Sequence, residues 1–317
     1  MDKPVIVGDV GGTNARLAIA KRLSNGKIDL THVGIKPVEE FRSLEAALEN
    51  WLVDIEEKPK NAVFALAGVT GSDEVRFTNS DWVVSASKIK EIFGLDSVLL
   101  VNDFAAQAMA IPATKDNAFE VINKGKPIDG APKVILGPGT GLGMAGLVQT
   151  NDGYRVMPTE GGHQAFAPRS DIEREILKIL ASAFDNVTFE HVVSGPGLLR
   201  IYKCLGTIRG EHTPFDTPPE IGEAAANLSS QLAVDAAKTL SLMLATFCAN
   251  AVLALGAQGG CVIAGGVAEQ LSKFIATDDF LERFKNIGVM SNYVRDVPLL
   301  RNTDKYAALR GAAMFAQ

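Results

Sequence analysis

Two glycine-rich segments, DVGGTN at Asp9–Asn14 and GPGTGLG at Gly137–Gly143, each follow an apolar run that predicts a β-strand. Glycines let backbone N–H groups approach phosphate oxygens closely, and hydroxyl and amide side chains add donors. Both segments are therefore predicted phosphate-binding loops, with a plain hairpin turn as the alternative for each. The residues expected to contact phosphate are Gly11, Gly12, Thr13 and Asn14 in the first loop and Gly139, Thr140 and Gly141 in the second.

Two common nucleotide motifs do not fit these loops. A Walker A loop needs a lysine directly after its glycines, and neither segment has one. The dinucleotide pattern GxGxxG matches Gly139 and Gly141 but meets Met144 at its last position.

Carboxylates end two of the predicted strands. Asp9 suits a Mg²⁺ ion, bound directly or through a water, beside a triphosphate; the alternative is an Asp that caps the loop. Asn102 and Asp103 close the apolar strand SVLLVND, at the sheet edge where α/β proteins bind ligands. A carboxylate there can accept a proton from an attacking hydroxyl. The alternative for Asp103 is an N-cap of the following helix.

Three further segments suggest a hydroxyl-rich ligand and a nucleoside. Glu160 and His163 flank two glycines, and Glu190 precedes SGPGL. Carboxylates accept hydrogen bonds from sugar hydroxyls, and His can donate or accept. The alternatives are a satisfied buried His and a turn that begins a helix. Gly265 and Gly266, after the strand CVIA, could pack flat against adenine or ribose, or simply end the strand.

A scaffold of strands must hold these loops in place, and the sequence contains the same strand pattern twice. The succession of strand, glycine loop, strand, turn and strand begins near Val5 and again near Val134. Helical stretches alternate with further strands, which indicates an α/β protein. One of them, SASKIKEIFG, predicts a helix that stops at Gly94. A length of 317 residues favours two lobes.

Composition excludes several other classes. The net charge of −6 argues against nucleic acid as a partner. The three cysteines are widely spaced, which predicts free buried thiols rather than disulfides or a metal knuckle. The N-terminal residues do not resemble a signal peptide. The uncharged stretch 239–268 is interrupted by glycines, so we expect a buried helix and a strand there rather than a membrane span.

Taken together, the motifs resemble the bacterial glucokinases. The resemblance covers nearly the whole chain in order: GDVGGTNARLA, FTNSDW, VNDFAAQAMAI, GPGTGLG, EGGH, SGPGL, AGG and LRGAA. It implies an actin-like, ribonuclease H-like hexokinase fold of two lobes, with a duplicated β-β-β-α-β-α core and an interdomain cleft. It also implies a small lobe of residues 1–112 plus 303–317, a large lobe of residues 113–302, and a cytoplasmic homodimer.

The same resemblance implies that the chain transfers the γ-phosphoryl group of ATP, with Mg²⁺, to the 6-hydroxyl of D-glucose. By motif match, Asp103 is the general base. The sugar ligands implied are Asn102, Asp103, Glu160, His163 and Glu190. The two loops correspond to phosphate sites, and Gly265 and Gly266 lie beside adenosine.

Two features of related ROK proteins (repressors, open reading frames and kinases) are missing. No CxCGxxGC motif follows EGGH, so no structural zinc is expected. The chain starts at its first strand without a helix-turn-helix, which excludes a repressor. The alternatives that remain open are a kinase for fructose or an N-acylated hexosamine, a non-catalytic sugar or nucleotide sensor, and an actin-like filament or chaperone ATPase.

Overall fold

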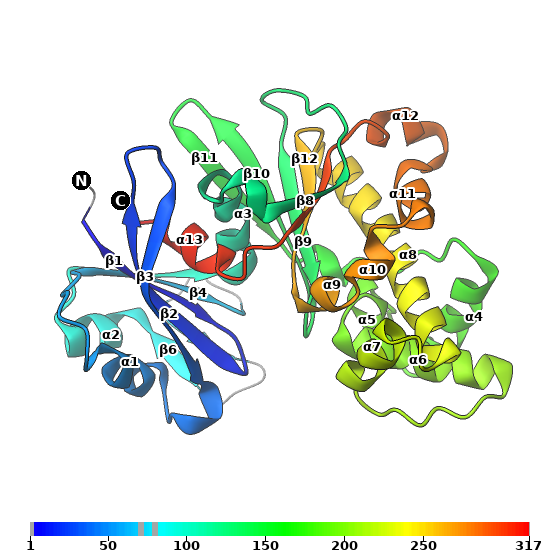
Figure 1. Cartoon of the computed structure of the whole chain (residues 1–317), viewed down its shortest axis with the longest axis horizontal. Helices are drawn as coiled ribbons and strands as arrows, with labels where there is room; N and C mark the ends of the chain where they lie inside the picture. The colour runs from blue at the N-terminus through cyan, green and yellow to red at the C-terminus, as the bar shows by residue number, and fades with distance from the viewer. Residues whose placement is uncertain (1–2, 69–72, 78–81, 317) are drawn as a thin grey trace. The chain divides into compact units, whose positions relative to one another are not determined.

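The computed structural model describes residues 3–68, 73–77 and 82–316. Thr78–Asp81, the centre of the FTNSDW motif, lie outside these residues. The chain divides into two compact units, coloured by residue number in Figure 1. The first unit comprises Met1–Ala118, Tyr154–Pro158 and Asp304–Gln317, and the second comprises Phe119–Gly153 and Thr159–Thr303.

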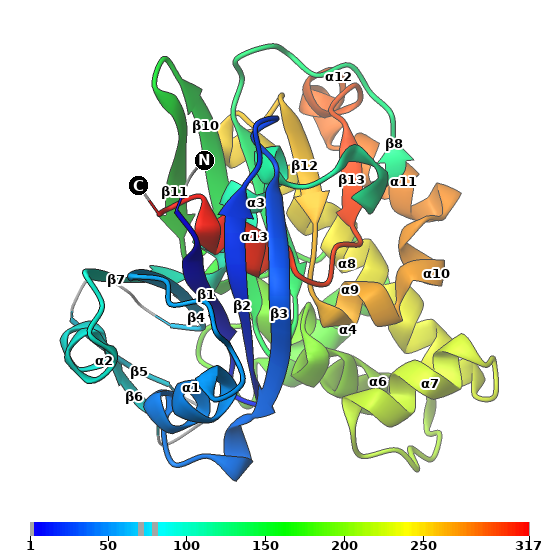
Figure 2. The ribbon, with the colours of Figure 1, turned by 60° about the vertical axis from the view of Figure 1, so that its left-hand side comes forward.

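The first unit is built on a five-stranded sheet with the order β3-β2-β1-β4-β7 (Figure 2). An antiparallel meander, β1 to β3, is followed by two strands parallel to β1. The strands of the sheet are β1 Val5–Val10, β2 Asn14–Arg22, β3 Ile28–Pro37, β4 Asn61–Leu66 and β7 Ser97–Asn102, and a separate hairpin pairs β5 Glu74–Arg76 with β6 Val83–Ser85. The helices are η1 Val38–Glu40, α1 Leu44–Leu52, α2 Ala86–Phe93, α3 Asp103–Ala113, η2 Asp116–Ala118 and α13 Ala307–Ala313.

Both faces of the central strand β1 are buried, and successive side chains along it point to opposite faces. Ile6 and Val10 of β1 belong to a core shared with α1 and α2. Val5 and Val7 belong to a second core, shared with α3 and α13. Figure 2 shows α13 against the long strands of the meander, on the side away from α1. This double covering explains why β1 reads as a nearly continuous apolar run.

The second unit repeats the topology. Its six-stranded sheet has the order β11-β10-β9-β12-β13-β8, so β9 to β12 correspond to β1 to β4. The predicted duplicated core is therefore confirmed. The strands are β8 Phe119–Asn123, β9 Lys133–Pro138, β10 Leu142–Thr150, β11 Gly153–Thr159, β12 Gly260–Ile263 and β13 Leu299–Asn302. The helices are η3 Gly161–His163, α4 Asp171–Leu180, α5 Phe189–Val192, α6 Gly195–Arg209, α7 Pro218–Ala226, α8 Gln231–Leu255, α9 Gly266–Gln270, α10 Ser272–Ile275, α11 Asp278–Lys285, η4 Gly288–Met290 and α12 Ser291–Val294.

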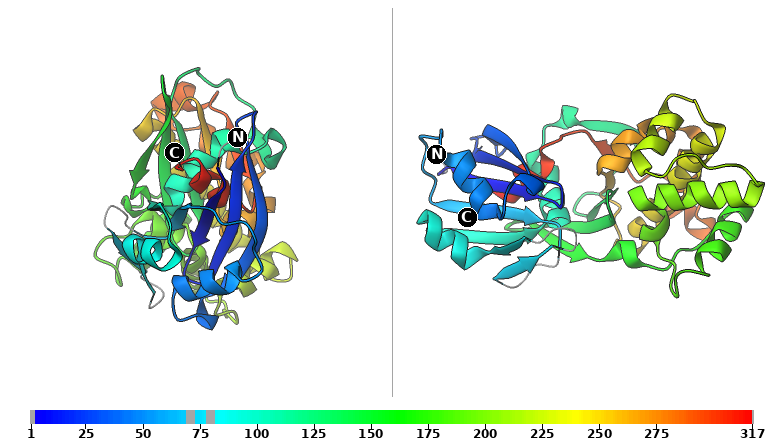
Figure 3. Two further views of the ribbon diagram at one scale, coloured as in Figure 1. Left: turned by 90° about the vertical axis from the view of Figure 1, so that its left-hand side faces the viewer. Right: turned by 90° about the horizontal axis from the view of Figure 1, so that it is seen from below.

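Helix α8 is the axis of the second unit's core. It is long and apolar enough to cross a membrane, yet 61% of its most apolar window is buried inside the protein. Helices α6, α7 and α11 pack against it, and Figure 3 shows the green-to-yellow helices gathered together in the view from below. Its burial among these helices accounts for its apolar composition. Helix α7 ends before α8 begins, and α8 stops at Gly256.

Helices α3 and α13 of the first unit meet at Gly311. A Cβ atom on Gly311 would lie 1.7 Å from the carbonyl oxygen of Ala106 and 2.9 Å from the nitrogen of Ala110. Both atoms belong to the backbone of α3, so neither can move away without shifting the helix. The close approach of the two helices therefore requires glycine at this position.

We predict that Gly311→Ala lowers the free energy of unfolding by about 1–3 kcal/mol, the usual cost of overpacking a core. Urea denaturation followed by circular dichroism measures it. Gly222→Ala is a matched control, because the three atoms nearest its Cβ would all lie at the end of the flexible Gln270 side chain. A loss at Gly311 no larger than that at Gly222 would contradict the prediction.

Candidate active site

In the first unit, the predicted site residues lie at the carboxyl ends of three parallel strands. The register pairs Val10 with Leu66, and Leu66 with Asn102. The first glycine loop, which follows Val10, and the Asn102–Asp103 pair are therefore at one sheet edge. Ligands bind at this edge in open α/β sheets.

Asn102, not Asp103, caps helix α3. Its side-chain oxygen accepts a hydrogen bond from the N–H of Ala105 at 3.0 Å, and its amide donates to the carbonyl of Gly68 at 3.2 Å. The capping role considered for Asp103 thus falls to its neighbour. Asp103 is the first residue of α3, and its Oδ1 accepts from the N–H of Phe104 at 2.8 Å. The positive end of the helix dipole favours a charged carboxylate at this position.

Asp9 forms an ion pair with Arg16 across the β1–β2 hairpin. The two residues face each other in the antiparallel register, and Arg16 Nη1 lies 2.9 Å from Asp9 Oδ2. The Asp9 side chain is 18% exposed and that of Arg16 is 41% exposed. Burial raises the pKa of Asp9 above its ordinary value of 3.8, and the neighbouring Arg16 opposes that rise. Sequence reasoning missed Arg16, although the GGTN turn between two strands places it opposite Asp9.

The first loop is closed by its own backbone. The N–H of Gly11 donates to the carbonyl of Asn14 at 3.0 Å, and the N–H of Val38 donates to the carbonyl of Thr13 at 2.9 Å. Asn14 is the first residue of β2. Within residues 3–68, 73–77 and 82–316, neither the N–H of Gly12 nor the hydroxyl of Thr13 forms a hydrogen bond, so this loop keeps donors for a ligand.

The carboxylate of Asp9 can serve as the single protein ligand of a Mg²⁺ ion. Such an ion takes one or two carboxylates and completes its shell with phosphate oxygens and waters. Arg16 bonds one Asp9 oxygen, Oδ2. Residues 3–68, 73–77 and 82–316 contain no cluster of three His, Cys, Asp or Glu side chains that could hold a metal without phosphate.

In the second unit, the loop Gly139–Gly141 connects β9 to β10 and is held at both ends. The N–H of Gly139 donates to the carbonyl of Gly141 at 2.8 Å. The N–H of Gly195, at the start of α6, donates to the carbonyl of Gly139, also at 2.8 Å. Thr140 is the central residue of this turn, between Gly139 and Gly141. The SGPGL segment thus fixes the second loop.

The AGG segment also lies against this loop. A Cβ on Gly137 would be 2.3 Å from the carbonyl oxygen of Ala264, and one on Gly265 would be 2.4 Å from that of Pro138. Gly265 also has a φ of +94°, in the region that favours glycine. Gly266 begins α9 and has open space at its Cβ position. These contacts place Gly265 and Gly266 directly beside the second loop.

Glu190 bonds directly to the second loop. Its Oε2 accepts a hydrogen bond from the N–H of Leu142 at 2.8 Å. A Cβ on Gly141 would lie 2.5 Å from the same oxygen. The hydroxyl of Ser194 donates to the carbonyl of Glu190 at 2.7 Å and, as the N-cap of α6, accepts from the N–H of Gly197. No sequence pattern predicted the Glu190–Leu142 bond.

The EGGH segment packs on the start of β10. A Cβ on Gly162 would lie 2.0 Å from the carbonyl oxygen of Leu142, and one on Gly161 would meet the side chain of Met144. Glu160 and His163 flank this contact, on either end of η3. The second unit therefore gathers Glu160, His163, Glu190, the second loop and the AGG segment around one turn, while the first unit gathers Asp9, the first loop, Asn102 and Asp103.

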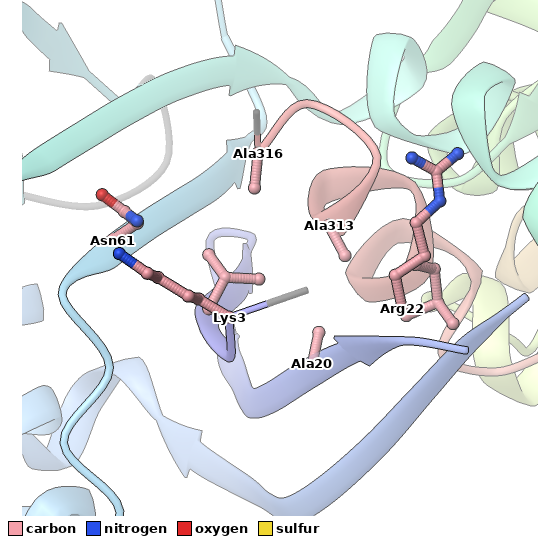
Figure 4. Close-up of a pocket in the computed structure, with 8 residues that line it drawn as sticks. Lys3, Ala20, Arg22, Asn61, Ala313 and Ala316 are labelled. Carbon is pink, nitrogen blue, oxygen red and sulfur yellow. The ribbon is translucent and has the colours of Figure 1, made fainter. Parts of the chain in front are cut away.

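One cavity of the first unit lies away from these residues (Figure 4). It measures about 510 Å³ and is lined by residues that include Val5, Ala20 and Asn61. Figure 4 shows Lys3 and Asn61 on one side of it and Arg22 on the other. Val5 and Asn61 are the first residues of β1 and β4, so this cavity is at the opposite edge of the sheet from Asp9 and Asn102.

We predict that Asp9→Asn is at least as stable as the parent protein at neutral pH. A raised folded-state pKa means that ionising Asp9 costs folding free energy, and this cost develops as pH rises from about 3.8 through the raised pKa. The stability advantage of the Asn variant should grow over the same range in urea denaturation. The half-exposed Arg16 can be hydrated when it loses its partner.

Arg16→Met is the opposing variant. It leaves the Asp9 carboxylate buried without its counter-charge, so it should lower stability at neutral pH. A marked destabilisation by Asp9→Asn at neutral pH would contradict the assignment of a burial cost to Asp9.

Comparison with known proteins identifies relatives of the whole chain. The family model described as Glucokinase matches residues 6–317. A glucokinase of Saccharophagus degradans is 36% identical over 312 residues, covering 98% of this chain and 97% of the relative. The crystal structure of a glucokinase from an Antarctic psychrotroph superimposes with a TM-score of 0.88 and 31% identity, covering 99% and 98% of the two chains.

A more distant structure shares the fold. The ROK family glucokinase from Streptomyces griseus, solved in complex with glucose and AMPPNP, has a TM-score of 0.68 at 17% identity and covers 99% of both chains. The chain therefore belongs to the glucokinase family, with its two-domain actin-like fold and the ATP-dependent phosphorylation of glucose as its activity.

Proposed function

We propose that Asp103 is the general base of this reaction and that the 6-hydroxyl of glucose is the acceptor. The carboxylate takes the proton of the 6-hydroxyl as its oxygen forms a bond to the γ-phosphorus of ATP. The bond from that phosphorus to the β-phosphate oxygen breaks, and ADP leaves. Phosphoryl transfer of this kind depends mainly on positioning and on stabilisation of charge. The place of Asp103, at the same sheet edge as the first loop and at a helix N-terminus, supports this role.

The proposed glucose ligands are carboxylate, amide and imidazole groups that match sugar hydroxyls. They are Asn102, Asp103, Glu160, His163 and Glu190. In the first unit, the cap at Asn102 orients the Asn102–Asp103 pair. In the second, the backbone contacts of Gly161 and Gly162 fix the segment that carries Glu160 and His163.

The bond from Leu142 to Glu190 is the observation that carries the proposal. It joins a predicted sugar carboxylate to the predicted phosphate loop at 2.8 Å, so sugar and phosphate sites would adjoin. A kinase requires this arrangement, because the acceptor hydroxyl and the γ-phosphate must be neighbours.

ATP is proposed to bind both loops through its phosphates, with Gly265 and Gly266 beside its adenosine. Mg²⁺ would arrive with ATP and neutralise phosphate charge, with Asp9 as its protein ligand, directly or through a water. The raised pKa and burial of Asp9 are consistent with a carboxylate retained for a cation. The first unit's other donors, the loop N–H groups, orient the phosphates.

The family resemblance also leads us to propose a cytoplasmic homodimer that supplies glucose 6-phosphate to glycolysis. The two lobes would follow the boundaries expected from the sequence, residues 1–112 plus 303–317 and residues 113–302. Analytical ultracentrifugation of the purified chain tests the dimer, and a single species of monomer mass across micromolar concentrations would refute it.

Asp103→Asn should lower the rate of glucose-dependent ADP release by about 100- to 10,000-fold, the usual contribution of a general base. Glucose affinity should change far less, because the amide keeps the shape of the carboxylate. A coupled assay with Mg²⁺ and ATP measures turnover, and isothermal titration measures glucose binding. Asp54→Asn, an exposed site on the same unit, is the control.

The same assay with a panel of hexoses tests the substrate. Greater turnover with fructose or an N-acylated hexosamine than with glucose would reassign it. Binding of glucose without turnover by the parent protein would indicate a sensor, and ATP turnover without sugar would indicate an actin-like ATPase. Near-normal turnover by Asp103→Asn would remove Asp103 from the role of base.

A pair of loop substitutions separates the sugar and phosphate functions. Gly141→Ala places a methyl group against Glu190 Oε2 and should raise the KM for glucose about tenfold, by displacing the carboxylate. Gly139→Ala meets no protein atom within 4 Å, so it should act on the KM for ATP and spare that for glucose. Steady-state kinetics measures both constants. Equal effects of the two variants on the KM for glucose would contradict the contact.

A further inference from the structure

The short helix α5, which carries Glu190, is capped by an unusual pair. Thr188 is the N-cap residue and His191 is the third residue of the helix. The N–H of Thr188 donates to Nδ1 of His191 at 3.0 Å, and the Thr188 hydroxyl lies 3.1 Å from the same nitrogen. In the usual capping box a Glu or Gln accepts the N-cap N–H. Here an imidazole is the acceptor, which requires an unprotonated Nδ1.

The surroundings of His191 favour its neutral ring over the protonated one. The ring stacks on Phe184, with centroids 4.1 Å apart and an interplanar angle of 29°. Arg200 of α6 lies over the Phe184 ring and donates from Nη1 to the carbonyl of His191 at 3.2 Å. Burial lowers the pKa of His191 below its ordinary value of 6.5, and the charge of Arg200 lowers it further. Glu190 opposes this shift, and His163 adds to it.

A single-turn helix depends strongly on its cap. Helix α5 has only four residues, Phe189–Val192, so few hydrogen bonds of its own hold its backbone. Glu190 lies between the two capping residues, and its carboxylate bonds to the second loop. The Thr188–His191 bond therefore fixes the backbone from which Glu190 reaches that loop. If Nδ1 of His191 were protonated, its N–H would face the N–H of Thr188. Neither group could accept, so the hydrogen bond between them would be lost.

We propose that His191 is a positioning residue for Glu190, and that its protonation weakens glucose binding by releasing the cap of α5. This inference rests on the proposed role of Glu190 as a sugar ligand. It adds to that role a pH-dependent control of affinity, built into the same segment. The groups that face His191 are Arg200 from α6, Glu190 on its own helix and His163 from η3.

The direction of the effect follows from the lowered pKa of His191. The unfolded chain binds a proton at this residue more readily than the folded chain does. The contribution of the cap is therefore complete above about pH 6.5 and is lost as pH falls through the lowered folded-state pKa. Glucose affinity should decline over that acid range and stay constant above it.

The decisive variant is His191→Gln. A Gln at this position accepts the N-cap N–H in ordinary capping boxes and does not titrate. Its KM for glucose should match the parent's at about pH 8, whereas on acidification the parent's KM should rise about 3- to 30-fold relative to the variant's. His191→Ala should raise the KM for glucose by a similar factor at every pH, with a smaller change in kcat. His212→Gln, at an exposed histidine, should follow the parent.

Identical pH profiles for the parent and His191→Gln would overturn the proposal and assign the acid dependence to other groups, such as His163. An unchanged KM for glucose in His191→Ala would also overturn it. Imidazole ¹⁵N NMR of the parent reports the state of Nδ1 without any substrate, and a protonated Nδ1 at neutral pH would refute the cap. An unchanged KM for glucose in Glu190→Gln, with the expected NMR titration, would instead refute the role of Glu190 in the proposed function.

Discussion

The close approach of backbone to backbone around the β9–β10 turn is the constraint on which the second unit's site depends. Gly137, Gly162 and Gly265 each lie where a Cβ atom would be within 2.4 Å of a carbonyl oxygen. Three segments far apart in the sequence therefore meet without intervening side chains. Because backbone positions vary less than side-chain rotamers, this contact holds the polar residues that flank it at fixed distances from the loop.

Local signals predicted most of the scaffold. The strands around both loops and the helix that ends at Gly94 follow from apolar runs and glycine stops, and Gly94 indeed adopts the left-handed conformation. The duplicated topology followed from the repeated order of strand and loop. These features depend on neighbouring residues, so the sequence carries them directly. The predicted site residues lie at the ends of the strands in this scaffold.

The contacts that orient the site were not predictable in the same way. Asn102 and Asp103 are equally good capping residues by type, and only the start of α3 decides between them. The hydrogen bond from Leu142 to Glu190 joins residues 48 positions apart, and no pattern within either segment predicts it. The buried charge of Asp9 depends on how the loop and α/β core surround it. Such properties arise from tertiary packing, which periodicity does not encode.

The position of α13 has a consequence for the order of assembly during synthesis. One face of the first unit's sheet is covered in part by Leu309 and Ala312, which follow the entire second unit in the chain. A ribosome-bound chain of the first 118 residues must therefore keep Val5 and Val7 partly uncovered until the last helix emerges. The first unit is the earliest to be made and the last to be completed, so the second unit can reach its final core before the first does.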